Sequence, residues 1–322
     1  MCIMNPSDNL IISYTTQNGD WYVSKFYEYL HLKLEQIFKI TFTYIPIQEL
    51  NELHKDSRIS SCLNSNNFFN WFNLIIYNPK TDQYFLHSSH DFTFEALQDG
   101  LERGYDIVKF SCVPDTEHNL YTKYKELTVP SVYRLENWSD YETILNQPKC
   151  KHQINQAFFI GLIHNDRARL MPELSKTNLL NVVDKYSTQP KCKEDYFKTL
   201  SIYKYNLSFN GVAGLCYRDL EIFGLGNFNL RAPYTCLTYN NIQKDVHYIE
   251  LFDKELISNI MDPSIDTFTQ MQTRIEEVMD FCNTKQGQEI LDQASLWFKE
   301  NVNPDKQVAI MCKIIEESNI LN

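Results

Sequence analysis

The segment Tyr203–Phe252 constrains the fold most, because it holds four of the nine glycines in a chain of 322 residues. Glycine is favoured where the backbone needs a positive φ or where another group must approach closely. The pattern Ile202–Phe209 is rich in Tyr and Ile and predicts a short strand. Asn210 then stands at an N-cap position, and helical spacing runs over Val212–Phe223. The segment therefore predicts a strand, a tight turn and a helix.

One face of the predicted helix is apolar and suits packing on a sheet. The other face presents Gly211, Gly214, Arg218 and Glu221. Backbone N–H groups at a helix N-terminus and a forked guanidinium both suit phosphate oxygens, and a nearby carboxylate can accept bonds from sugar hydroxyls. This face predicts a nucleotide-diphosphate site. The alternative is an ordinary strand-to-helix junction whose Arg and Glu form a solvated ion pair.

Short motifs extend this pattern along the chain. They are Phe158-Phe159-Ile160-Gly161 with Arg167 and Arg169, Lys204-Tyr205, Gly211-Val212-Ala213, Arg218, and Val246-His247-Tyr248-Ile249. Together they resemble the donor-binding half of the protein O-glucosyltransferase and capsule-glycan transferase family. The resemblance covers Ala157–Phe252, and the segment after Arg218 departs from it. There, Asp219-Leu220-Glu221 and Gly224-Leu225-Gly226 are more similar to other transferases of the GT-B fold.

The resemblance implies a GT-B fold, in which two Rossmann-like α/β domains face a cleft and helices close the C-terminus. It also implies donor binding by residues of the second domain. The donor-binding candidates are Arg167, Arg169, Lys204, Gly211, Gly214, Arg218, Glu221 and His247. Three of them have a plainer alternative, which is a surface charge at a helix start for Arg167 and Arg169 and a packed strand residue for His247. The segment Gly224–Asn229 could also pass close to the base or ribose, and its alternative is a helix C-cap at Gly224.

Strand and helix patterns alternate along the first half of the chain, which predicts an open α/β sheet. A strand at Asn9–Tyr14, a helix beginning after Asp20 and a strand at Phe38–Tyr44 predict a βαβ unit. A polar, Pro-containing segment at Gln147–His152 marks the expected boundary. The predicted domains are 1–150, on the acceptor side, and 151–322, on the nucleotide-sugar side.

Further strands are expected at Trp71–Tyr77 and Gln83–His87, joined by a turn, and at Tyr105–Ser111. The sequence after Phe252 changes to helical spacing. Three closing helices are expected at about Asp266–Cys282, Gln286–Asn301 and Pro304–Ser318.

An inverting transfer needs a base that takes the proton of the acceptor hydroxyl. Asp91, with His90 beside it after a predicted strand, is the first candidate, and Asp115 is the second. Loop aspartates are also common turn formers, so that alternative stays open. The pair Asp115 and Glu117 also fits a metal site, although a lone D-x-E pattern is not specific.

The net charge of −11 argues against sequence-independent binding of nucleic acid. Nine scattered cysteines without C-x-x-C spacing indicate free thiols in a reducing compartment. No signal peptide or membrane-spanning run is expected, so the prediction is a cytoplasmic protein without an integral membrane segment. The dinucleotide, P-loop, nucleophile-elbow and H-E-x-x-H motifs are absent from the sequence.

The sequence is thus interpreted as a glycosyltransferase that uses a nucleoside-diphosphate sugar, with UDP favoured, and a hydroxyl of a glycan or glycoprotein as acceptor. Inversion is expected from the resemblance. No metal and no cofactor are expected, because cations and helix dipole neutralise the leaving group and the nucleotide sugar is a substrate. The alternatives are a non-catalytic nucleotide- or glycan-binding protein and a nucleotide-sugar epimerase.

Overall fold

The computed structural model divides the chain into two compact units. Unit 1 comprises Met1–Trp138, Cys236–Tyr239 and Asn303–Asn322, and unit 2 comprises Ser139–Thr235 and Asn240–Val302. The structure describes residues 9–14, 21–47, 49–50, 72–88, 108–110, 112–114, 140–147, 154–161, 166–184, 192–209, 215–234, 236–238, 242–262 and 264–322.

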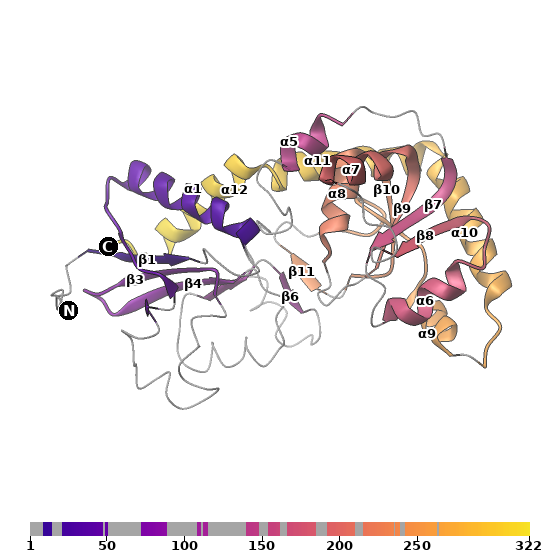
Figure 1. The fold of residues 1–322 in the computed structure, drawn as a ribbon, viewed down its shortest axis with the longest axis horizontal. Coiled ribbons are helices and arrows are strands. Elements are labelled where there is room, and N and C mark those ends of the chain that lie inside the picture. The colour runs from indigo at the N-terminus through magenta and orange to yellow at the C-terminus, as the bar shows by residue number, and fades with distance from the viewer. Residues whose placement is uncertain are drawn as a thin grey trace. The chain divides into compact units, whose positions relative to one another are not determined.

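Unit 1 holds a five-stranded mixed sheet with the order β2-β1-β3-β4-β5 (Figure 1). Strand β1 pairs in parallel with β2 and antiparallel with β3, and β4 pairs antiparallel with β3 and in parallel with β5. The expected βαβ unit is present as β1, α1 and β2. The elements of unit 1 are β1 (Ile11–Tyr14), α1 (Trp21–Phe38), β2 (Thr43–Tyr44), β3 (Leu74–Asn78), β4 (Gln83–Ser88), β5 (Val108–Phe110), β6 (Cys112–Pro114), β11 (Cys236–Thr238) and α12 (Pro304–Glu317).

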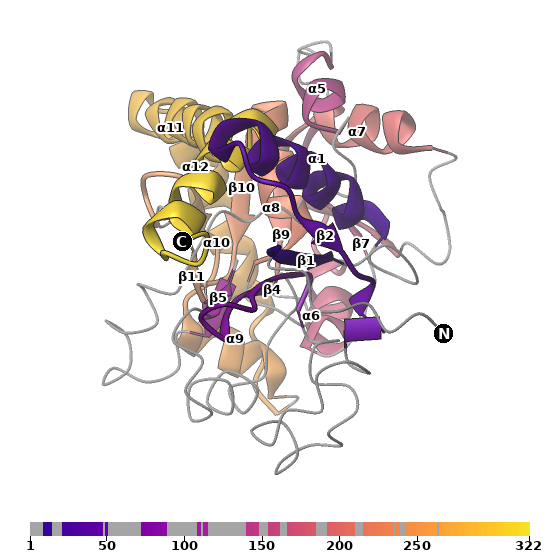
Figure 2. The same cartoon turned by 90° about the vertical axis from the view of Figure 1, so that its left-hand side faces the viewer.

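Helix α12 packs beside α1 within unit 1 (Figures 1 and 2). Its start is well specified, since Pro304 occupies the first turn and the Asn303 side chain accepts a hydrogen bond from the Lys306 N–H. The residues after α12 are tied to the sheet by buried Asn78, whose Nδ2 donates to the carbonyls of Ile320 (3.0 Å) and Asn322 (2.8 Å). Of the three closing helices, the first two therefore belong to unit 2, and the last one, α12, belongs to unit 1.

We expect Asn78→Ala to lower the free energy of unfolding of unit 1 by about 1–3 kcal/mol, because the buried carbonyl of Ile320 and the part-buried carbonyl of Asn322 lose their donor. Thermal and urea unfolding followed by circular dichroism measure this loss. Lys80→Ala, in the exposed part of the same turn, is the control and leaves the unfolding midpoint nearly unchanged. Equal midpoints for the two variants would contradict the role of the Asn78 amide.

Unit 2 holds a five-stranded sheet with the order β12-β10-β9-β7-β8, in which every pair is parallel. Strands β7 and β9 are neighbours in the middle, although β8 lies between them in sequence. The elements are α5 (Asp140–Leu145), β7 (Ile154–Gly161), α6 (Asp166–Leu174), β8 (Leu180–Asp184), α7 (Lys193–Ile202), β9 (Tyr203–Ser208), α8 (Tyr217–Leu225), β10 (Phe228–Arg231), β12 (Ile249–Glu250), α9 (Lys254–Met261), α10 (Phe268–Cys282) and α11 (Lys285–Asn301).

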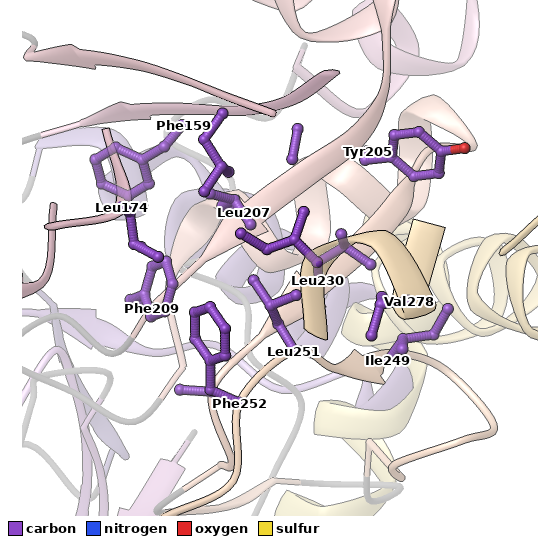
Figure 3. Packing of buried hydrophobic residues seen from close by; sticks show 14 of the residues in the cluster. Phe159, Leu174, Tyr205, Leu207, Phe209, Leu230, Ile249, Leu251, Phe252 and Val278 are labelled. Atoms are coloured by element: carbon purple, nitrogen blue, oxygen red, sulfur yellow. The ribbon is translucent and has the colours of Figure 1, made fainter. Parts of the chain in front are cut away.

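Helices cover both faces of this parallel sheet, as a doubly wound α/β fold requires. Helix α6 packs against α9, whereas α8 packs against α5, α7 and α11 on the other side (Figure 1). The α6 side contains the main apolar core, in which Phe159, Leu207 and Leu230 of adjacent strands meet Val278 of α10 (Figure 3). Because every strand of this sheet runs in the same direction, the carboxyl ends of the strands share one edge. The mixed α/β class with a parallel sheet agrees with the sequence prediction.

Two local predictions in unit 2 were wrong. The helix expected from Val212 begins at Tyr217, because Cys216 rather than Asn210 acts as its N-cap. The Asp219 carboxylate accepts from the Cys216 N–H, which closes a capping box at that point. The C-cap is Gly226, at φ +71°, and not Gly224.

Candidate functional site

The candidate site lies at the carboxyl edge of the parallel sheet, between β7 and β9. After β7 the chain enters α6 on one face, and after β9 it enters α8 on the other. A doubly wound sheet binds its ligands at such a topological switch point, where the two following loops diverge. Arg167 of α6 and Arg218 of α8 come from these two connections. The structure thus brings together two of the residues singled out in the sequence.

Arg218 reaches across the end of β7. Its Nη2 donates to the carbonyl of Ile160, and its guanidinium carbon lies 4.5 Å from the centre of the Phe159 ring. The residue is only 9% exposed. Its Nε and Nη1 atoms are buried and have no hydrogen-bond partner in the structure as described. A buried guanidinium with two unused donors is costly in a folded protein and indicates a place for an acceptor-bearing ligand.

Arg167 approaches the same aromatic ring from α6. Its guanidinium carbon lies 5.6 Å from the Phe159 ring centre, and its Nη2 donates to the carbonyl of Phe209 and to Sγ of Cys216 (3.1 Å). Burial lowers the pKa of Arg167, and the positive charge of Arg218 lowers it further, while Cys216 and Asp219 act in the opposite direction. Two buried cations repel each other, and an anion placed between them stabilises both.

The acid nearest to Arg218 in sequence does not neutralise it. The buried Asp219 carboxylate accepts from Arg231 Nη1 (2.8 Å) and Asn229 Nδ2 (3.0 Å), and both members of the ion pair are fully buried. Arg231 also stacks on Tyr234, with 3.2 Å between the guanidinium carbon and the ring centre. The Asp219 carboxylate is therefore part of the interior of unit 2, as the partner of Arg231 and Asn229.

Sequence reasoning missed the Asp219–Arg231 pair. The signal was the alternation along β9 and β10, in which every second residue of the strand is polar and points to the face toward α8. This face consists of Asn206, Ser208, Asn229 and Arg231, all buried. A buried polar side chain requires partners, so a carboxylate on the covering helix was to be expected.

Glu221, the expected ribose acceptor, is also engaged within the protein. Its carboxylate accepts from the Tyr196 hydroxyl (2.7 Å) and from Lys193 Nζ (3.3 Å), both on α7. Burial raises the pKa of Tyr196 well above its ordinary value, and the Glu221 charge adds to this, while Arg218 beside it acts oppositely. Glu221 thus lies within a polar network close to Arg218.

The remaining donor candidates with described positions come from three different parts of unit 2. Lys204 stands near the amino end of β9, where its Nζ contacts Oδ1 of Asn283. Arg169 is exposed on α6. His247 lies in a turn before β12, and its Nδ1 accepts from the Gln243 N–H (2.9 Å). Burial lowers the pKa of this imidazole.

Several predicted residues lie outside the described residues. These are the acceptor-side candidates His90, Asp91 and Asp115, and the glycines Gly211 and Gly214. No group of three or more His, Cys, Asp or Glu side chains placed to hold a metal ion occurs within the described ranges. No helix in the described part of the chain combines the length and the apolar character that crossing a membrane requires.

Comparison with known proteins gives little further guidance. No protein-family model matches the chain, and no curated protein matches it. Among solved structures, the crystal structure of a glycosyltransferase from Rickettsia africae ESF-5 is similar, with a TM-score of 0.44 and 12% identity over 97% of each chain. A similarity of this size does not establish a family, so the functional argument depends on the site.

Proposed function

We propose that this protein is a glycosyltransferase that moves a sugar from a nucleoside-diphosphate donor, UDP-linked by preference, to a hydroxyl group of a glycan or glycoprotein. The donor diphosphate binds at the carboxyl edge of the unit 2 sheet, between Arg167 and Arg218. The acceptor binds to unit 1, and transfer inverts the anomeric centre without a metal ion. The facing of the two units across a cleft is part of this proposal.

One observation carries the proposal. Arg218 is buried at the switch point of a doubly wound sheet, and its Nε and Nη1 atoms have no hydrogen-bond partner among the described residues. The chain as a whole is acidic, with a net charge of −11, so a buried guanidinium that meets no carboxylate among the described residues stands out. Charge-assisted hydrogen bonds from arginine to phosphate oxygens satisfy such donors well.

The geometry suggests how these residues act. As the bond between the anomeric carbon and the diphosphate oxygen breaks, negative charge develops on the leaving diphosphate. Guanidinium groups fixed in a buried setting stabilise that charge without reorganisation, which lowers the barrier to transfer. The acceptor oxygen forms the new bond to the anomeric carbon, and its proton passes to a base on the acceptor side, for which Asp91, His90 and Asp115 remain the candidates.

A panel of UDP-, GDP-, ADP- and CDP-sugars tests the proposal. We expect one sugar nucleotide to raise the unfolding temperature and to release its nucleoside diphosphate slowly in the presence of EDTA and without acceptor. Binding without turnover, even when glycan acceptors are supplied, would favour the non-catalytic alternative. Conversion of the sugar without net release of nucleotide would favour an epimerase. The absence of binding by every member would overturn the proposed donor site.

A further inference from the structure

We propose that Gly161 is a positioning residue for Arg218: its missing side chain leaves the space through which the guanidinium reaches the ligand-binding edge. This inference rests on the proposed function, because it assigns Arg218 to the donor diphosphate. Gly161 is the last residue of β7. Its effect on the ligand is indirect, since it acts only through the place that Arg218 takes.

The space at Gly161 is filled by the arginine. A Cβ atom built on Gly161 would overlap Arg218 Nη2 and would lie 3.2 Å from both Arg218 Cζ and Phe159 Cζ. The same Nη2 donates to the carbonyl of Ile160, the preceding residue. The guanidinium therefore lies directly against the backbone at the end of β7 while its flat face covers Phe159. Any side chain at position 161 competes with it for this place.

Backbone conformation gives no other reason for a glycine here. Among the described residues, Gly226 is the glycine with positive φ, and Gly161 lies in a regular strand paired with Asp184 of β8. An alanine therefore fits the strand conformation at position 161. The overlap involves the end of a flexible side chain, so alanine displaces the guanidinium and not the strand. The expected consequence is local.

The displacement changes the site in two ways. The hydrogen bond to Ile160 fixes one corner of the guanidinium, and the Phe159 ring fixes its plane. Without these contacts the N–H groups on Nε and Nη1 lose their fixed direction, and the separation from Arg167 is no longer set. Preorganised donors bind an anion more tightly than donors that must be ordered on binding. The site then keeps its charge and loses its geometry.

A double-mutant cycle tests this inference, with UDP as the probe and GDP, ADP and CDP beside it. The variants are Gly161→Ala, Arg218→Ala and the combination, each measured by titration calorimetry and by thermal unfolding. We expect Gly161→Ala to weaken nucleotide binding about tenfold. In the Arg218→Ala background the same change has almost no further effect, because the group that it displaces is gone. The double variant is expected to be as stable as Arg218→Ala.

A measurement without ligand makes the test independent of the proposed function. The arginine Nε–H signals of ¹⁵N-labelled protein report the position of each guanidinium, and the Arg218 signal is assigned by its loss in Arg218→Ala. Because Arg218 lies over the Phe159 ring, its signal carries a ring-current shift. We expect this shift to disappear in Gly161→Ala.

The outcomes separate the two proposals. An unchanged Arg218 signal in Gly161→Ala overturns the positioning role, whatever the nucleotides do. A loss of stability on Gly161→Ala that is as large in the Arg218→Ala background as in the parent protein also overturns it, since the glycine would then serve the strand. A lost ring-current shift without binding of any nucleotide supports the positioning role and refutes the donor site.

Discussion

Replacing Arg231 by methionine lowers the free energy of unfolding of unit 2 by about 3–5 kcal/mol, because it leaves the Asp219 carboxylate buried without its cation. Both side chains are fully buried, and Nη1 lies 2.8 Å from Oδ2. The lost stacking on Tyr234 adds to the effect. Urea and thermal unfolding measure the change, which corresponds to a fall in the unfolding temperature on the order of 10 °C.

Two controls separate the buried charge from general damage. Lys244→Met breaks the exposed pair with Glu250 and is expected to change stability by about 0–1 kcal/mol. The double variant Arg231→Met with Asp219→Asn removes the stranded charge and is expected to recover part of the loss. A double variant no more stable than Arg231→Met would show that the charge is not the cause.

Replacing Arg218 by alanine is expected to weaken binding of the nucleoside diphosphate about 10- to 150-fold. This range follows from about 1.5–3 kcal/mol for a hydrogen bond to a charged group, converted at about 1.4 kcal/mol per tenfold. Nε and Nη1 are the Arg218 nitrogen atoms without a hydrogen-bond partner among the described residues. Titration calorimetry with UDP, GDP, ADP and CDP measures the effect.

Arg218→Lys keeps the charge and loses the planar fork, so its affinity is expected to fall between those of the parent protein and the alanine variant. Lys198→Ala removes a positive charge from the exposed surface of α7 and serves as the control for net charge. An equal loss of affinity in Lys198→Ala and in Arg218→Ala would mean that the loss comes from the change in net charge and not from a specific contact. Unchanged affinity in Arg218→Ala would remove the donor site from this edge of the sheet.

The sequence was most informative where periodicity and capping residues act locally. The closing helices α10, α11 and α12 begin within two residues of their expected positions. Thr284 and Asn303 cap α11 and α12 through bonds to N–H groups three residues further on. The strand pair β3 and β4 was likewise expected from two short strand patterns that flank a turn.

The start of α8 shows where local reasoning failed. Asn210 is a good N-cap by residue type, whereas a cysteine is not, and the pattern alone favoured the earlier start. The actual start depends on Asp219, which accepts from the Cys216 N–H while Arg231 and Asn229 hold it in place. Those partners come from β10, so the boundary is decided by a contact across the fold.

The candidate site divides in the same way. Residue types suited to a phosphate group, Arg167 and Arg218, and the α/β alternation that places them after strands could be read from the sequence. The folded chain was needed to show that Glu221 is engaged by α7, that Lys204 stands at the other end of its strand, and that a side chain at position 161 would overlap Arg218. Periodicity shows which face of an element is buried, whereas the partner of a buried polar group depends on which strands become neighbours.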